Sequence, residues 1–128
     1  MIYSVARIGV AAALALGGGA ASASELQATV PARFQGEWAG SLKTCGAVGD
    51  DSRLTIGAGQ ISFYESRGAI KAVVTQGESE LALIAELSGE GERWLSLSHF
   101  RLSGDQKTLN DVTSDPETVR HRCPKPTK

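Results

Sequence analysis

The stretch from Phe34 to Leu42 decides how this chain folds; it reads Phe-Gln-Gly-Glu-Trp-Ala-Gly-Ser-Leu. At a period of two, Phe34, Trp38 and Leu42 share one face, and the opposite face carries small and polar side chains. Because neighbouring side chains of a strand point to opposite faces, this alternation predicts a strand with one buried side. Gly36 and Gly40 lie between the large residues, and we expect them to let the strand bend sharply or another backbone approach.

Short alternating segments separated by turn residues follow this stretch. They predict further strands at residues 52–56, 60–66, 69–76, 79–87, 92–102, 107–112 and 118–123. Short strands at such regular spacing are typical of sandwiches and barrels. The sequence therefore predicts an all-β fold, a small antiparallel eight-stranded barrel or sandwich. Its structural core is predicted to include Phe34, Gly36, Trp38, Trp94 and Phe100.

The first 23 residues have the features of a signal peptide. Arg7 precedes a short apolar run at residues 8–16, and Ala21-Ser22-Ala23 is a small-x-small cleavage pattern. The run is too short to span a bilayer, and a buried N-terminal helix is the alternative interpretation. We expect cleavage near Ala23–Ser24 and a periplasmic or secreted product. The predicted organisation is a signal peptide at 1–23, a leader at 24–33, a barrel domain at 34–123 and a tail at 124–128.

The two cysteines, Cys45 and Cys123, lie near the two ends of the mature domain. In an oxidising compartment such a pair forms a disulfide. The alternative is a metal site, but the chain has only two histidines and no Cys-x-x-Cys pair, so we predict no metal. Since the first and last strands of a closed barrel are neighbours, a bridge between Cys45 and Cys123 is expected to lock the closure.

Charge in the mature chain is nearly balanced. The first 23 residues carry one of the 13 Lys and Arg residues and none of the 14 Asp and Glu residues, so the mature net charge is about −2. This balance argues against a nucleic-acid partner and gives no attraction to anionic membranes. No second apolar run is long enough to span a bilayer, so we expect no membrane insertion of the mature chain.

The pair Gly36-x-Trp38 on a first strand resembles the lipocalin superfamily. The resemblance implies a barrel floor closed by the indole, with an arginine of the last strand, Arg120 or Arg122, packed over it. The chain is also similar to small secreted eight-stranded barrels that inhibit bacterial proteases and carry one disulfide. The mature chain is shorter than a typical lipocalin, so the resemblance does not imply a large ligand cup.

Signatures of catalysis are missing from the sequence. There is no Ser-x-x-Lys, no Gly-x-Ser-x-Gly and no phosphate-binding loop. No spacing pairs His99 or His121 with a nucleophile and an acid, so we interpret both as hydrogen-bonded or solvated side chains. We predict no catalytic residue, no cofactor and no enzymatic activity.

Residues 92–102 are apolar on both faces. If Trp94 and Phe100 fill the barrel, the leucines between them project outward. An outward apolar strip rimmed by charge is typical of a contact surface. The predicted partner-binding residues are Ile84, Leu95, Leu97, His99 and Arg101. The alternative is that leader residues 25–30 fold back and cover this strip.

The inward-facing residues are numerous enough to fill a small barrel, which disfavours a carrier of large ligands. We therefore predict an exported soluble binding module, with an inhibitor-type role as one form, that acts on an unknown protein partner in the cell envelope or outside the cell. The alternative is a binder of a small apolar ligand inside the barrel. We expect a monomer.

Overall fold

Strands account for almost all regular structure in residues 23–125, which are the residues that the computed structural model describes. The strands are β1 (Ser24–Gln27), β2 (Gly36–Ala39), β3 (Leu54–Ile56), β4 (Gln60–Ser62), β5 (Arg67–Gln76), β6 (Glu80–Gly89), β7 (Glu92–Leu102), β8 (Thr108–Asp111) and β9 (Thr118–Arg122). Two 3-10 helices, η1 (Ala32–Phe34) and η2 (Leu42–Thr44), flank β2. The predicted all-β class is confirmed.

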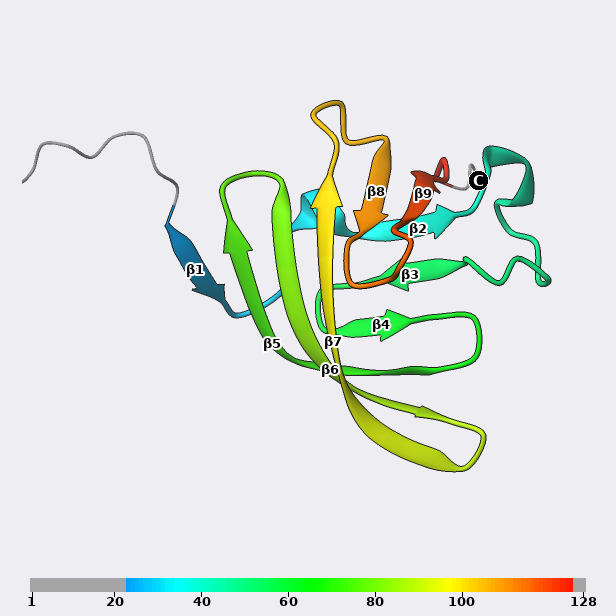
Figure 1. Ribbon diagram of the computed structural model, residues 1–128, viewed down its shortest axis with the longest axis horizontal. Coiled ribbons are helices and arrows are strands. Elements are labelled where there is room, and N and C mark those ends of the chain that lie inside the picture. The colour runs from blue at the N-terminus through cyan, green and yellow to red at the C-terminus, as the bar shows by residue number, and fades with distance from the viewer. Residues whose placement is uncertain (1–22, 126–128) are drawn as a thin grey trace, which may run out of the picture.

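The eight strands β2 to β9 form a closed antiparallel barrel (Figure 1). Neighbouring strands in the chain pair from β2 to β9, and β2 pairs with β9 to close the circle. Closure removes the sheet edges wherever pairing is complete. Of the two predicted architectures, the structure is therefore the barrel.

The leader is part of the barrel wall, which corrects the predicted boundary at residue 34. One edge of β5 is divided between two strands, because β4 pairs with residues 67–69 and β1 pairs with residues 73–76. The chain then crosses the end of the barrel through Val30, whose amide donates to the carbonyl of Ala58, and through η1. The strand β1 was missed because its partner lies about fifty residues away in the sequence.

A β-bulge in β5 changes which side chains face inward. The pairing with β6 shifts between Ile70 and Ala72, so Lys71 is the extra residue. An extra residue moves all later side chains to the other face. Val73 and Thr75 are consequently buried, whereas Val74 between them is only partly buried.

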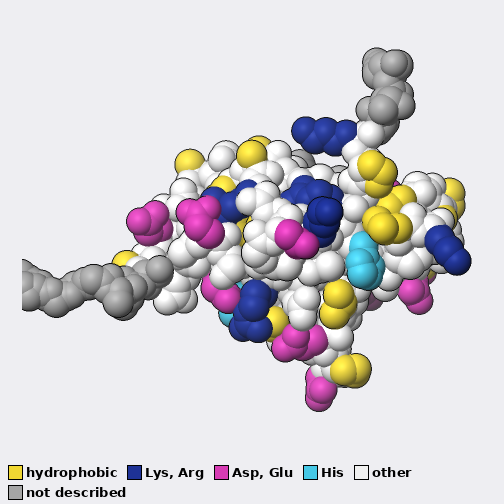
Figure 2. Space-filling model, turned by 90° about the horizontal axis from the view of Figure 1, so that it is seen from above, with side chains coloured by type: hydrophobic (Ala, Val, Ile, Leu, Met, Phe, Trp, Pro, Cys, Tyr) yellow, Lys and Arg dark blue, Asp and Glu magenta, His cyan; other side chains and the backbone are white. Residues whose placement is uncertain are grey.

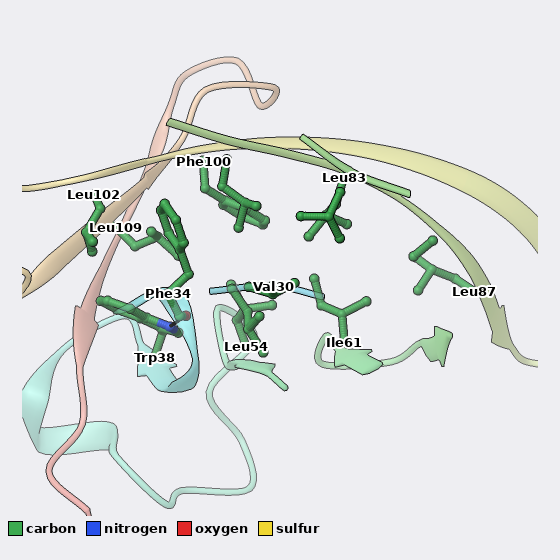
Figure 3. Close-up of a cluster of buried hydrophobic side chains, with 14 residues drawn as sticks. Val30, Phe34, Trp38, Leu54, Ile61, Leu83, Leu87, Phe100, Leu102 and Leu109 are labelled. Carbon is green, nitrogen blue, oxygen red and sulfur yellow. Dashed lines mark hydrogen bonds between the residues drawn. The ribbon is translucent and has the colours of Figure 1, made fainter. Parts of the chain in front are cut away.

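Apolar side chains fill the barrel interior (Figure 3). They come from most strands and from the segment before β2, and each is almost fully buried. The cluster consists of Val30, Phe34, Trp38, Leu54, Ile56, Ile61, Val73, Leu81, Leu83, Ala85, Leu87, Phe100, Leu102 and Leu109. Burial is therefore confirmed for the predicted core residues Phe34, Trp38 and Phe100.

One end of the barrel, which we call the closed end, is built around Trp38 and Arg122. The Arg122 guanidinium lies 4.3 Å from the centroid of the Trp38 ring, and the indole nitrogen donates to the Phe34 carbonyl at 3.1 Å. Of the two arginines considered, Arg122 therefore covers the indole. Gly36 adopts φ +131°, a conformation that favours glycine, and a Cβ there would lie 3.3 Å from Arg122 Nη1.

The disulfide joins Cys45 to Cys123 across 78 residues, as predicted. Cys45 follows η2 and Cys123 follows β9, so the bridge ties together the two strands that close the barrel. Strand β2 ends at Ala39, earlier than expected. Leu42 therefore lies in η2 and is exposed, which corrects its predicted inward position.

The predicted core position of Trp94 is wrong, because its side chain is 41% exposed. Phe100 and Arg101 of β7 pair with both β6 and β8, whereas residues 92–98 pair with β6 alone. Figure 1 shows this part of the β6–β7 hairpin extending past the rest of the barrel. The side chain of Trp94 lies on the inward face of β7, as expected, but among the described residues no opposing strand covers it at this position. We call this region, residues 63–66 and 88–94, the hairpin end.

The expected signal peptide falls on residues 1–23, which lie outside the described residues except for Ala23. Within residues 23–125, no helix has the length and apolar character needed to cross a membrane.

Candidate functional site

Large aliphatic side chains from β1, β6 and β7 gather on the outer face of the sheet. Leu26, Ile84, Leu95 and Leu97 are 79%, 39%, 69% and 63% exposed. We call these four residues the outer strip. Three of them were predicted as contact residues, and the structure leaves all three accessible.

The strand register makes the outer strip continuous. Ile84 on β6 lies directly opposite Leu97 on β7 and opposite Ala72 on β5. Leu26 on β1 lies opposite Val74, two residues further along β5. The alternative interpretation required the leader to cover Leu95 and Leu97, and it does not. The leader instead extends the apolar surface with Leu26.

Charged and polar groups rim one end of the outer strip, and Glu80 organises them. One carboxylate oxygen of Glu80 lies 2.6 Å from His99 Nε2, and the other accepts a hydrogen bond from Arg101 Nε at 2.8 Å. Burial acts to raise the pKa of Glu80, but the hydrogen bonds and positive charges of Arg101 and His99 outweigh it, so this pKa is lowered. The predicted residues His99 and Arg101 are therefore held by a carboxylate that the sequence analysis did not single out.

A second charged pair lies on the other side of the outer strip. Lys71 Nζ approaches a Glu86 carboxylate oxygen at 3.9 Å, and both side chains are largely exposed. Lys71 occupies this place because it is the extra residue of the β5 bulge. Glu86 lies opposite Leu95 across β6 and β7, so the apolar surface is bordered by charge at both ends.

The sequence alone did not indicate two residues of this surface, Leu26 and Glu80. Both can be placed only when the register of the strands is known. Leu26 joins the strip only because β1 pairs with β5, and nothing local in Ser24–Gln27 indicates that pairing. Glu80 was detectable in principle, because the β6–β7 hairpin, which turns at residues 90–91, places it opposite Arg101. Opposite charges at paired positions of two antiparallel strands are a usable signal.

A polar hollow of about 940 Å³ lies at the hairpin end, separate from the outer strip. Its lining includes Arg53, Arg67 and Arg93, together with Glu37 and Glu65. Among the described residues, the three arginines form no ion pair. On the face seen in Figure 2, side chains of both signs are interspersed, in keeping with the balanced composition.

Arg120 and Asp111 form a charged pair in the interior of the barrel. Arg120 is buried inside the barrel, where its Nε donates to the Ser52 carbonyl and its Nη1 lies 3.6 Å from Asp111. Burial lowers the pKa of Arg120, and the charge of Asp111 opposes this shift. Across residues 23–125, no group of three His, Cys, Asp or Glu side chains is placed to hold a metal ion.

Comparisons with protein-family models, with curated proteins and with solved structures gave no match to this chain.

Proposed function

We propose that this chain is an exported binding module of the inhibitor type, which contacts a protein partner in the cell envelope or outside the cell through the outer strip. The observation that carries the proposal is a contrast between inside and outside. Fourteen buried residues fill the barrel, yet four large aliphatic side chains stay exposed together on its outer face. Such a patch, rimmed by charge, is characteristic of a protein contact surface.

The energetics favour a partner that covers these side chains. Removing a leucine side chain from water contributes up to about 1.5–3 kcal/mol. Leu95 and Leu97 alternate along one strand with Ile84 beside them, so a single partner surface reaches all three. The filled interior supports this proposal over the alternative of a small apolar ligand held inside the barrel.

Two features support export and the lipocalin-like resemblance. The disulfide between Cys45 and Cys123 suits an oxidising compartment, and residues 1–23 have a signal-peptide pattern. The stacking of Arg122 on Trp38 matches what the resemblance implies for the barrel floor. In this proposal the mature chain begins near Ser24 and acts in the periplasm or outside the cell.

The test is a matched pair of double variants. Leu95→Asp with Leu97→Asp places two charges on the outer strip, whereas Leu42→Asp with Val48→Asp places two on exposed residues elsewhere. Immobilised wild-type protein and both variants are incubated with envelope and secreted fractions of the host, and retained proteins are identified by mass spectrometry. We expect a defined protein that the wild type and the Leu42/Val48 variant retain and the Leu95/Leu97 variant loses.

The thermal midpoint of both variants is expected to stay nearly unchanged, because all four side chains are exposed. Unfolding of the Leu95/Leu97 variant would show that the strip is structural. Native mass spectrometry of protein purified from its host distinguishes the alternative: a retained small apolar molecule would contradict the proposed function.

A further inference from the structure

Half of one edge of β7 has no neighbouring strand among the described residues. Strand β8 pairs with residues 100–102 of β7, and the amide of Val112 extends this contact by donating to the His99 carbonyl. Residues 92–98 pair with β6 on their other side, without a break in register. A row of unpaired backbone groups of this kind is a template for a further strand.

The backbone groups that face this free edge can be identified from the ladder. The amide of Leu102 donates to Ser79 on the β6 side, whereas the His99 carbonyl accepts on the β8 side. Since these directions alternate along an antiparallel strand, odd-numbered residues of β7 direct N–H and C=O away from β6. The groups at the free edge therefore belong to Arg93, Leu95 and Leu97, two of which are members of the outer strip.

The same chain shows how such a half-edge is filled. On β5, β4 pairs with residues 67–69, and the four-residue strand β1 pairs antiparallel with residues 73–76 beyond it. On β7, β8 pairs with one part of the corresponding edge, residues 100–102. The other part, residues 92–98, has no neighbouring strand on that side among the described residues. A short extended segment can therefore complete β7 in the way that β1 completes β5.

A small acidic pocket on the Trp94 face lies at this part of the hairpin. It has a volume of about 320 Å³ and is lined by Glu65, Glu90, Glu92 and Trp94, among others. Among the described residues, none of the three carboxylates forms an ion pair. Arg93 lies next to Trp94 in the chain, but its side chain points to the opposite face of β7. Carboxylates beside an exposed indole suit a lysine or arginine side chain, through ion pairing and a cation–π contact.

We propose that an extended segment of the partner protein adds to residues 92–98 of β7 as an antiparallel strand. Its apolar residues lie on the face of Leu95 and Leu97, and a lysine or arginine on the alternate face enters the pocket of Trp94, Glu90 and Glu92. This inference rests on the proposed function and specifies the kind of partner. Strand addition of this type takes affinity from the backbone and specificity from alternate side chains.

The first experiment uses a labelled peptide in which valine and lysine alternate, with fluorescence anisotropy as the readout. We expect saturable binding, and binding weaker by about tenfold when glutamate replaces lysine. In an antiparallel addition, residues on the Leu95 face direct their amides at β7. A peptide N-methylated on its valines should therefore lose binding, whereas one N-methylated on its lysines should keep it.

The second experiment uses variants of the protein. Glu90→Gln with Glu92→Gln should weaken lysine-peptide binding several-fold, whereas Asp51→Asn with Glu78→Gln removes the same formal charge elsewhere and should leave it unchanged. Arg93→Pro removes one edge amide and should weaken binding; Arg93→Ala keeps that amide and serves as its control. Bound peptide should also slow hydrogen exchange of the Leu95 and Leu97 amides.

Equal binding of the two methylated peptides, or no binding of the lysine peptide, overturns the proposal. A dimer seen by sedimentation, with the Leu95 and Leu97 amides protected in the absence of peptide, also overturns it because a second copy then occupies the edge. Partner capture that depends on Leu95 and Leu97 without protecting their amides keeps the proposed function and rejects the added strand. If a partner protects these amides but is still captured by the Leu95/Leu97 double variant, the added strand is kept and the proposed role of the outer strip is rejected.

Discussion

The two ends of the barrel each hold one tryptophan, and the two side chains have opposite surroundings. At the closed end, Trp38 is fully buried, its nitrogen is hydrogen-bonded to Phe34, and Arg122 covers its ring. At the hairpin end, Trp94 is 41% exposed beside carboxylates that have no ion-pair partner within residues 23–125. Both residues have inward parity on their strands, so the difference comes from what lies across the barrel from each.

Under the proposed function, this contrast separates a structural end of the barrel from an end available for recognition. At the closed end, each of the three guanidinium nitrogens of Arg122 donates to a backbone carbonyl, and the disulfide lies close by. At the hairpin end, backbone groups and charged side chains stay open to contacts. We therefore expect substitutions at the closed end to change stability and substitutions at the hairpin end to change binding.

The largest expected difference is between the tryptophans themselves. Trp38→Ala should lower the free energy of unfolding by about 3–5 kcal/mol, a large part of the about 5–15 kcal/mol typical of a domain. Trp94→Ala should lower it by less than about 1 kcal/mol. Urea unfolding of both variants measures the two values. Equal losses would show that Trp94 is packed in solution and would remove the distinction between the ends.

Removal of the disulfide is the next largest effect. Cys45→Ser with Cys123→Ser should lower the free energy of unfolding by about 4 kcal/mol, because the bridge restricts a long loop of the unfolded chain. Native-state hydrogen exchange can locate the effect. We expect faster opening of β2 and β9 than of the β6–β7 hairpin, and opening of both at one rate would contradict a local role at the closed end.

The arginines give a smaller contrast. Arg122→Lys keeps the charge but loses the planar group that donates to the carbonyls of Gln35, Arg33 and Gln106, so we expect a loss of about 1–3 kcal/mol. Arg93→Lys, at the hairpin end, should change stability by less than about 0.5 kcal/mol. Thermal unfolding of the pair checks the difference, and an unstable Arg93→Lys variant would indicate a contact that the static geometry does not contain.

The smallest effect concerns pH and the rim of the outer strip. The pKa of Glu80 is lowered in the folded protein, so the charged form contributes stability above the ordinary value of 4.5, and this contribution is lost as pH falls through the lowered pKa. Glu80→Gln should therefore be less stable than wild type at neutral pH, and the gap should narrow on acidification below pH 4.5. A gap that is constant from neutral to acidic pH would mean that the carboxylate charge contributes nothing.

Sequence reasoning predicted most strands because the alternation of apolar residues is a local property. For residues 92–102, where alternation runs unbroken, the predicted and observed strands coincide. Alternation alone could not place Val73 and Thr75 inward, because the bulge at Lys71 inverts parity without any change in composition. It also missed β1, whose four residues are mostly exposed and whose partner is distant in the chain.

The candidate surface was predictable only in part. The outward direction of Leu95 and Leu97 follows from the parity of one strand, and the structure leaves both exposed. The contribution of Leu26, the position of Glu80 and the exposure of Trp94 depend on which strands lie side by side and where pairing stops. Those are properties of the register of the whole sheet, and no single segment contains them.

The pairing of β2 with β9 has a consequence for the order of folding. The contact joins Trp38 to Arg122, so it links the start of the barrel to a segment formed late along the chain. Contacts of such long sequence separation form slowly, because a large loop must close before they contribute. Until β9 arrives, β2 and β8 each present an unpaired edge, and Cys45 has no partner thiol within reach. Closure of the ring and completion of the covalent link therefore depend on the same event, the docking of β9.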